Sequence, residues 1–129
     1  MSSLHSELLL DHFRNPRNPG VLPAPAVTVD VENPACGDWL RISAEIADGR
    51  IARTGFQVRG CTASIAAGSA LSEWLKGRKP ADVARMQPAE IAAAIESMLG
   101  GLTLETKHAA ALAADGALSL SQSAAGAGR

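Results

Sequence analysis

The segment that decides the fold is WLRISAEIADGRIARTGFQVR, residues 39–59. Its first half alternates apolar and polar side chains with a period of two, which is typical of a β-strand with one buried face. Asp48-Gly49 comes next, and this dipeptide favours a type I′ turn, whose two central residues both need positive φ. The second half again alternates, with Ala52, Thr54 and Phe56 on one face and Arg53 and Gln57 on the other. The segment therefore predicts an antiparallel β-hairpin.

The flanking sequence extends this hairpin into an α+β domain. Residues 27–31 alternate valines with polar residues and predict a third antiparallel strand with one solvent-facing side. We expect an N-terminal helix, capped by Ser2 or Ser3 and ending near Phe13, before the sheet. Apolar positions at helical spacing predict further helices after the sheet, at residues 62–76, from Pro88 to Leu99, and at 104–118, where Gly116 weakens the helical pattern. These helices would pack on one face of a three-stranded sheet.

Length and charge narrow the class of protein. The chain has 129 residues, which suits a single domain over 1–120, and residues 121–129 are expected to form a disordered tail. Lys and Arg number 12 against 13 for Asp and Glu, which argues against nucleic-acid binding. No apolar run approaches the ~20 residues of a membrane span. The first residues lack the pattern of a signal peptide, so a cytoplasmic location is expected.

Four side chains are candidates for a metal site. Cys36 and Asp38 lie in a glycine-containing turn before a predicted strand, and Cys61 lies where the hairpin ends and a helix begins. A thiol at a helix N-terminus favours the thiolate form, which binds soft metals. With His108 these residues would supply two sulfurs, one nitrogen and one oxygen. From the residues alone, a buried structural role for each cysteine and a Cys61–His108 nucleophilic pair both stay open.

The two other histidines carry no such prediction. His5 and His12 fall in the predicted first helix, and we expect both to be solvated or to cap the helix.

Three motifs in order resemble those of one known family. They are DHFRNPRN at 11–18, PACGD at 34–38, and GCTASIA at 60–66 followed by EWLKG at 73–77. Together they are similar to the IscU/NifU-type iron–sulfur cluster assembly scaffolds, whose N-terminal NifU-like domain is a compact α+β unit. The resemblance implies a scaffold or carrier, not an enzyme, which binds iron or a [2Fe–2S] cluster, or zinc in its place, and transfers it to apo-proteins.

The same resemblance assigns ligands and partners. Carried over residue by residue, Cys36, Asp38, Cys61 and His108 match the family's ligands, whereas Ala109 stands where the third cysteine is expected. The family's partners would be a cysteine desulfurase and apo iron–sulfur proteins, and a homodimer is left open. Because of Ala109, the alternative is a degenerate scaffold, zinc-bound or metal-free, that acts as a desulfurase interaction or sulfur-relay module. The segment 102–107 also lacks the prolines by which an Hsp70-type chaperone recognises the family.

Overall fold

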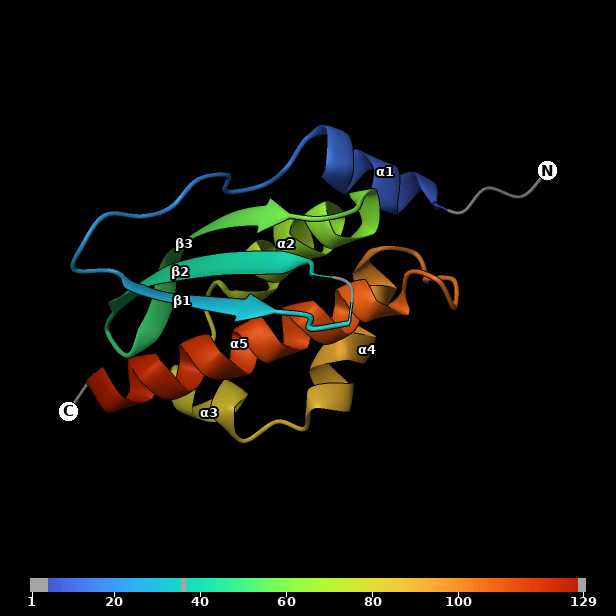
Figure 1. The fold of residues 1–129 in the computed structure, drawn as a ribbon. Coiled ribbons are helices and arrows are strands. Elements are labelled where there is room, and N and C mark those ends of the chain that lie inside the picture. The colour runs from blue at the N-terminus through green and yellow to red at the C-terminus, as the bar shows by residue number, and fades with distance from the viewer. Residues whose placement is uncertain (1–4, 36, 128–129) are drawn as a thin grey trace.

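The structure is a computed structural model that describes residues 5–35 and 37–127. Helices lie on one side of a small sheet (Figure 1). One helix precedes the three strands in the sequence, and the other helices follow them. The elements follow in the order α1 (Glu7–Arg14), β1 (Val27–Glu32), β2 (Trp39–Ala47), β3 (Arg50–Arg59), α2 (Thr62–Leu75), α3 (Pro80–Ala84), α4 (Pro88–Met98) and α5 (Lys107–Ala127). Within the described ranges, no helix is long and apolar enough to cross a membrane.

The sheet is the predicted antiparallel meander, with strand order β1-β2-β3. Asp48 and Gly49 have φ values of 54° and 77°, so the hairpin turn has the positive φ at both positions that the sequence required. A bulge near Glu45 and Ile46 shifts the register of β2 against β3. Because a bulge adds one residue to one strand, Ala52 is exposed and does not lie on the inner face with Phe56.

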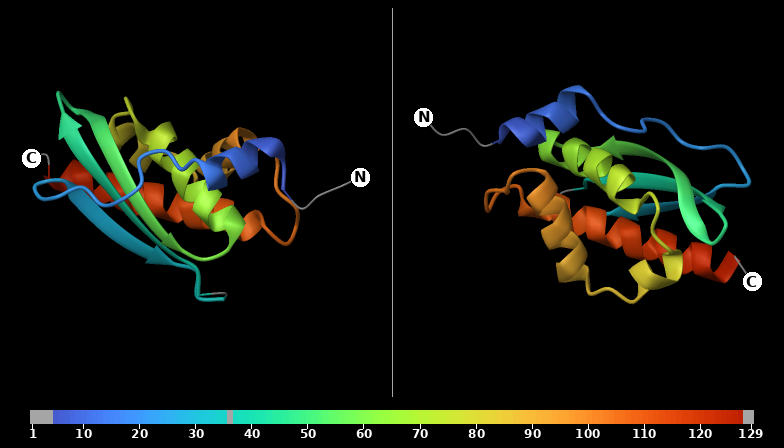
Figure 2. Two further views of the ribbon diagram at one scale, coloured as in Figure 1. Left: turned by 90° about the horizontal axis from the view of Figure 1, so that it is seen from above. Right: turned by 180° about the vertical axis from the view of Figure 1, so that it is seen from behind.

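Two helices cover the inner face of the sheet. α2 contacts β3, and α5 contacts β1 and β2, while α4 and α3 pack behind α5 and α1 packs on α2 (Figure 2). The α+β architecture expected from the sequence is therefore confirmed. Small side chains dominate the helical part of the core, which lets the helices approach the sheet closely. Fully buried members include Leu40, Ile42, Ala66, Ala67, Ala70, Leu71, Ala113 and Ala117.

The helix boundaries differ from the predictions at both ends of the chain. Ser6 caps α1, because its Oγ accepts a hydrogen bond from Leu9 N–H, so the cap is neither Ser2 nor Ser3, which lie outside the described residues. α5 continues to Ala127, well beyond the predicted end at residue 118. Residues 121–127, expected to be a tail, are helical, and burial of the apolar side chains of Leu120 and Ala124 accounts for the extension.

α5 continues through Gly116, although glycine is a poor helix former. A Cβ atom built on Gly116 would lie 2.7 Å from Leu40 Cδ2 of the sheet. The glycine therefore serves the close approach of α5 to β2, and packing on the sheet outweighs its low helix propensity of about 1 kcal/mol.

His12 contradicts the expectation of a solvated or capping histidine. Its ring is buried at 8% exposure between α1 and α2, and Nδ1 lies 2.8 Å from Ser69 Oγ. Ser69 Oγ also accepts a hydrogen bond from Arg17 N–H, so the same hydroxyl joins the ring of His12 to the segment after α1. Burial, and secondly the nearby Arg17 charge, lower the pKa of His12 below its ordinary value of 6.5.

This burial predicts acid sensitivity of the domain. A histidine whose pKa is lowered by folding stabilises the fold above about pH 6.5, and this contribution is lost as the pH falls toward the lower folded pKa. We expect the free energy of unfolding of the wild type to fall below about pH 6.5 by up to ~1.4 kcal/mol per pH unit. Urea unfolding of the wild type and of His12→Gln across this range measures the effect, and equal pH slopes in both would contradict it.

Candidate metal centre

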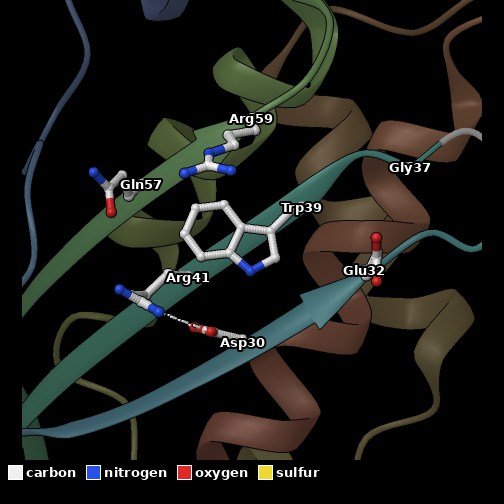
Figure 3. A pocket seen from close by; sticks show the side chains of 7 residues that line it. All are labelled: Asp30, Glu32, Gly37, Trp39, Arg41, Gln57 and Arg59. Atoms are coloured by element: carbon white, nitrogen blue, oxygen red, sulfur yellow. Dashed lines mark hydrogen bonds and ion pairs between the residues drawn. The ribbon is translucent and has the colours of Figure 1, made fainter.

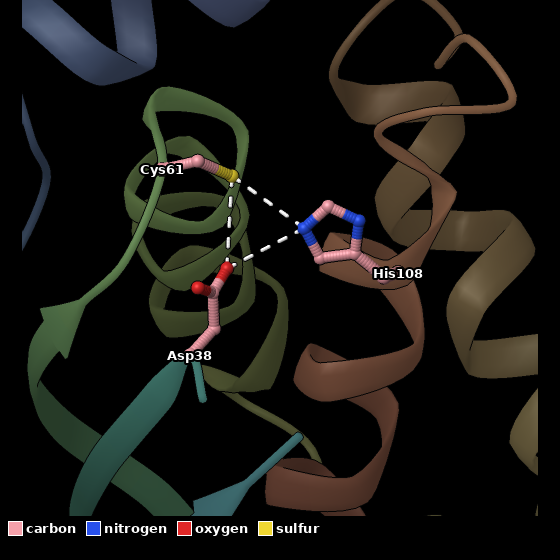
Figure 4. A group of neighbouring side chains, drawn as sticks. All are labelled: Asp38, Cys61 and His108. Carbon is pink, nitrogen blue, oxygen red and sulfur yellow. Dashed lines mark hydrogen bonds and ion pairs between the residues drawn. The ribbon is translucent and has the colours of Figure 1, made fainter. Parts of the chain in front are cut away.

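Three chain segments bring one ligand-type side chain each to the same end of the domain (Figure 4). Asp38 directly precedes β2, and Cys61 is the N-cap residue of α2, separated from the end of β3 by Gly60 alone. His108 lies in the first turn of α5. Because β2 starts where β3 ends and both helices begin at this end of the sheet, the antiparallel fold itself makes the three side chains converge.

The distances between the three donor atoms are those of a single coordination sphere. Cys61 Sγ lies 3.5 Å from His108 Nε2 and 3.6 Å from Asp38 Oδ2, and His108 Nε2 lies 3.4 Å from the same oxygen. Zinc bonds of about 2.3 Å to sulfur and about 2.1 Å to nitrogen or oxygen, at tetrahedral angles, separate the donor atoms by about 3.4–3.6 Å. The three atoms therefore fit one face of a tetrahedron around one ion.

Asp38 is held in place by hydrogen bonds. Ser64 Oγ–H, one helical turn after Cys61, donates to Asp38 Oδ2 at 2.5 Å and lies 3.5 Å from Cys61 Sγ. Burial by itself would raise the pKa of Asp38, but hydrogen bonds from Ser64 and from the backbone and thiol of Cys61, with the nearby His108, hold it below its usual value. The carboxylate is therefore ionised at neutral pH and oriented toward the other two donor atoms.

Gly60 leaves the space in which this carboxylate lies. A Cβ atom on Gly60 would stand 2.7 Å from Asp38 Cγ and 2.9 Å from Oδ2. Any larger residue would push the carboxylate away from its position against the backbone. The glycine before the cysteine is thus part of the geometry of the centre.

The centre opens to solvent on one side. Asp38 is buried, with 12% of its side chain exposed, whereas 29% of the His108 side chain is exposed and Cys61 is exposed. An ion held here would keep an accessible position, so incoming thiolates or water could replace the protein ligands one at a time.

The structure places three of the four predicted ligands together: Asp38, Cys61 and His108 form a group within 4.8 Å of one another. Cys36 lies outside the described residues. Ala109 is fully buried and packs in the hydrophobic core.

Sequence reasoning missed two residues that shape the centre. Ser64 had a readable signal, since a serine three residues after an N-cap cysteine shares its helix face. Gly60 had none, because the close contact with Asp38 depends on the tertiary fold.

The sequence and the fold both match known proteins. Residues 4–123 match the family model of the NifU-like N terminal domain. The iron–sulfur cluster assembly scaffold protein IscU 1 of Archaeoglobus fulgidus is 37% identical over 112 residues, covering 87% of this chain and 71% of the relative. The zinc-dependent sulfurtransferase SufU of Bacillus subtilis is 33% identical over 78 residues, covering 60% and 52%.

A solved structure supports the fold independently. The N-terminal part of a NifU-like protein from Brucella abortus superposes with a TM-score of 0.69 at 16% identity, covering 91% of each chain.

Proposed function

This chain belongs to the NifU-like N-terminal domain family, and from that premise we propose that it is an iron–sulfur cluster assembly scaffold or carrier. Iron or a [2Fe–2S] cluster is its cargo, received at Asp38, Cys61 and His108, with Cys36 as the fourth ligand. Apo-proteins are the acceptors. The protein holds and hands over the cargo, so it is a binding protein and not a conventional enzyme.

The observation that carries the proposal is the convergence of one sulfur, one nitrogen and one oxygen at tetrahedral distances. Thiolates and imidazole are ligands of iron–sulfur clusters, while a carboxylate is a harder and weaker ligand for soft metals. A mixed set therefore holds a cluster less tightly than four thiolates would. Together with the exposed side at Cys61 and His108, this favours release to an acceptor over permanent storage.

The partners in this proposal follow from the chemistry of the cargo. The sulfur must be supplied by a cysteine desulfurase as a persulfide, which an electron donor reduces by two electrons to sulfide. The finished cluster must then transfer to the cysteines of an apo-protein. The proposal places this exchange in the cytoplasm, where reducing conditions keep the Cys61 thiol available.

One observation favours a second candidate function. The donor distances suit a single zinc ion, and one relative is named a zinc-dependent sulfurtransferase. With alanine at 109, one thiol fewer is available than the family pattern provides. In this alternative the chain is a zinc-bound or metal-free module that docks a cysteine desulfurase and relays sulfur through Cys61 as a persulfide.

Anaerobic reconstitution tests the first function. The purified protein is incubated with ferrous iron and sulfide, desalted, and examined by visible absorption and by iron and sulfide content. We expect a bound cluster in the wild type and in Lys107→Ala, a control beside the centre whose exposed ion pair with Glu96 contributes little stability. We expect none in Cys61→Ala.

The outcome separates the two candidates. A wild type that takes up no iron, or a Cys61→Ala variant that loads as the wild type does, would refute the scaffold function. Stoichiometric zinc without cluster uptake, together with an added sulfur on Cys61 in mass spectra after incubation with a desulfurase, would establish the relay.

A further inference from the structure

The outer face of the sheet, opposite the helices, carries a polar hollow (Figure 3). Its volume is about 420 Å³. It adjoins the metal centre along the chain, because Trp39 follows Asp38 directly and Arg59 precedes Gly60 and Cys61. The lining residues are Asp30, Glu32, Gly37, Trp39, Arg41, Gln57 and Arg59.

These side chains form two parallel rows across the strands. In the first row Glu32 of β1 pairs with Trp39 of β2, which pairs with Arg59 of β3. In the second row Asp30, Arg41 and Gln57 occupy the same strands in the same order. Both rows thus run from a carboxylate on β1 to a hydrogen-bond donor on β3, so the face is acidic along one edge and donor-rich along the other.

In the first row, the charged side chains at both ends have no ion-pair partner among the described residues. Arg41 is committed to Asp30 through two hydrogen bonds of 2.7 and 2.9 Å. Within the part of the chain that the structure describes, neither Glu32 nor Arg59 has an ion-pair partner. The Arg41 and Arg59 guanidiniums lie 5.0 and 5.4 Å from the centre of the Trp39 ring. The half-buried indole therefore lies between two cations at the middle of the first row.

This pattern is complementary to itself. A two-fold axis that lies between two facing sheets and runs along β2 exchanges the β1 edge of one copy with the β3 edge of the other. Glu32 then faces Arg59 of the second copy twice, Asp30 faces Gln57 twice, and Trp39 faces Trp39 at the axis. An axis across the strands would instead set Glu32 against Glu32, so the charges select one arrangement. Sheets packed face to face normally align their strands within about 30°, as this axis requires.

We propose that this face docks a second copy of the same chain, with the Glu32–Trp39–Arg59 row as the contact. The N-terminal segment limits its size, because Leu22 N–H donates to Ser43 Oγ and covers the next part of the outer face. Because the contact is confined to the part of the face that this segment leaves open, we expect a weak dimer that exchanges rapidly. Because the axis runs along the strands, both Cys61 thiols lie at the same end of the dimer.

Sedimentation equilibrium of the metal-free protein at low salt, from about 10 µM to about 1 mM, measures the association. We expect a monomer–dimer equilibrium that weakens as salt is added. Glu32→Arg alone and Arg59→Glu alone should each raise the dissociation constant by at least ~100-fold, because like charges then meet at two symmetry-related places. The double variant that carries both reversals restores opposite charges and should associate as the wild type does.

The matched control is Glu45→Arg, which makes the same change of charge on the same sheet but lies about 20 Å from Trp39 along β2. It should dimerise like the wild type, and circular dichroism of every variant confirms that each is folded. A wild type that stays monomeric over the whole range would overturn the proposal and leave the face to a different partner. A double variant that stays as weak as the single ones would overturn it too.

Discussion

Replacing His108 by alanine raises the dissociation constant for zinc by more than about 100-fold, since even the loss of an outer partner of a ligand typically costs 10–100-fold. The imidazole supplies one of three donor atoms whose distances of 3.4–3.6 Å define the coordination face. Without it, Cys61 and Asp38 remain of the three converging donors, with Cys36 as the proposed fourth ligand, and more of the coordination sphere is left to water. Competition with a chromophoric chelator at neutral pH measures the constant.

Two further variants provide zinc dissociation constants with which that of His108→Ala can be compared. Ser64→Ala keeps all three ligands but removes the hydroxyl that orients Asp38, so we expect a smaller loss of about 10-fold. Lys107→Ala changes the residue next to His108 without touching the donors and should bind zinc as the wild type does. Zinc binding by His108→Ala that equals the wild type would show that the three side chains do not form a metal site.

The sheet was predictable because its determinants are local. The period-two pattern and Asp48-Gly49 fix the strands and the turn within one continuous segment. Because the three strands are followed by helices in the sequence, the helices were predicted to pack on one face of the sheet. The bulge that exposes Ala52 escaped prediction because it depends on pairing between strands and has no marker in residues 50–53.

Prediction failed wherever a contact joined distant segments. His12 looks solvated in an isolated helix, and only the packing of α1 on α2 sets it against Ser69. Gly116 looks like a helix breaker until the sheet approaches it. The candidate ligands could be named from residue type and family resemblance, but the 3.5 Å between Cys61 and His108, which are 47 positions apart, depends on the fold. Local patterns therefore predict the elements, and tertiary packing determines the centre.

Gly68→Val destabilises the domain by about 3 kcal/mol, which lowers the melting temperature by ~10 °C for a chain of this size. Gly68 lies in the middle of α2 at its contact with β3, and a Cβ atom there would stand 2.7 Å from Phe56 Cδ2 and 2.9 Å from Val58 Cγ2. Both neighbours belong to the sheet face that the helix covers, so neither can move without opening the core. Valine adds two further methyl groups to this collision.

Helix propensity cannot produce this loss, because valine is a better helix former than glycine in a helix interior. Ala93→Val, on the exposed side of α4, introduces the same side chain without a collision and should cost no more than about 0.7 kcal/mol. Thermal unfolding followed by circular dichroism compares the two variants. If Gly68→Val melted within 2–3 °C of the wild type, roughly the effect of 1 kcal/mol, the close packing of α2 on β3 that also positions Cys61 would be wrong.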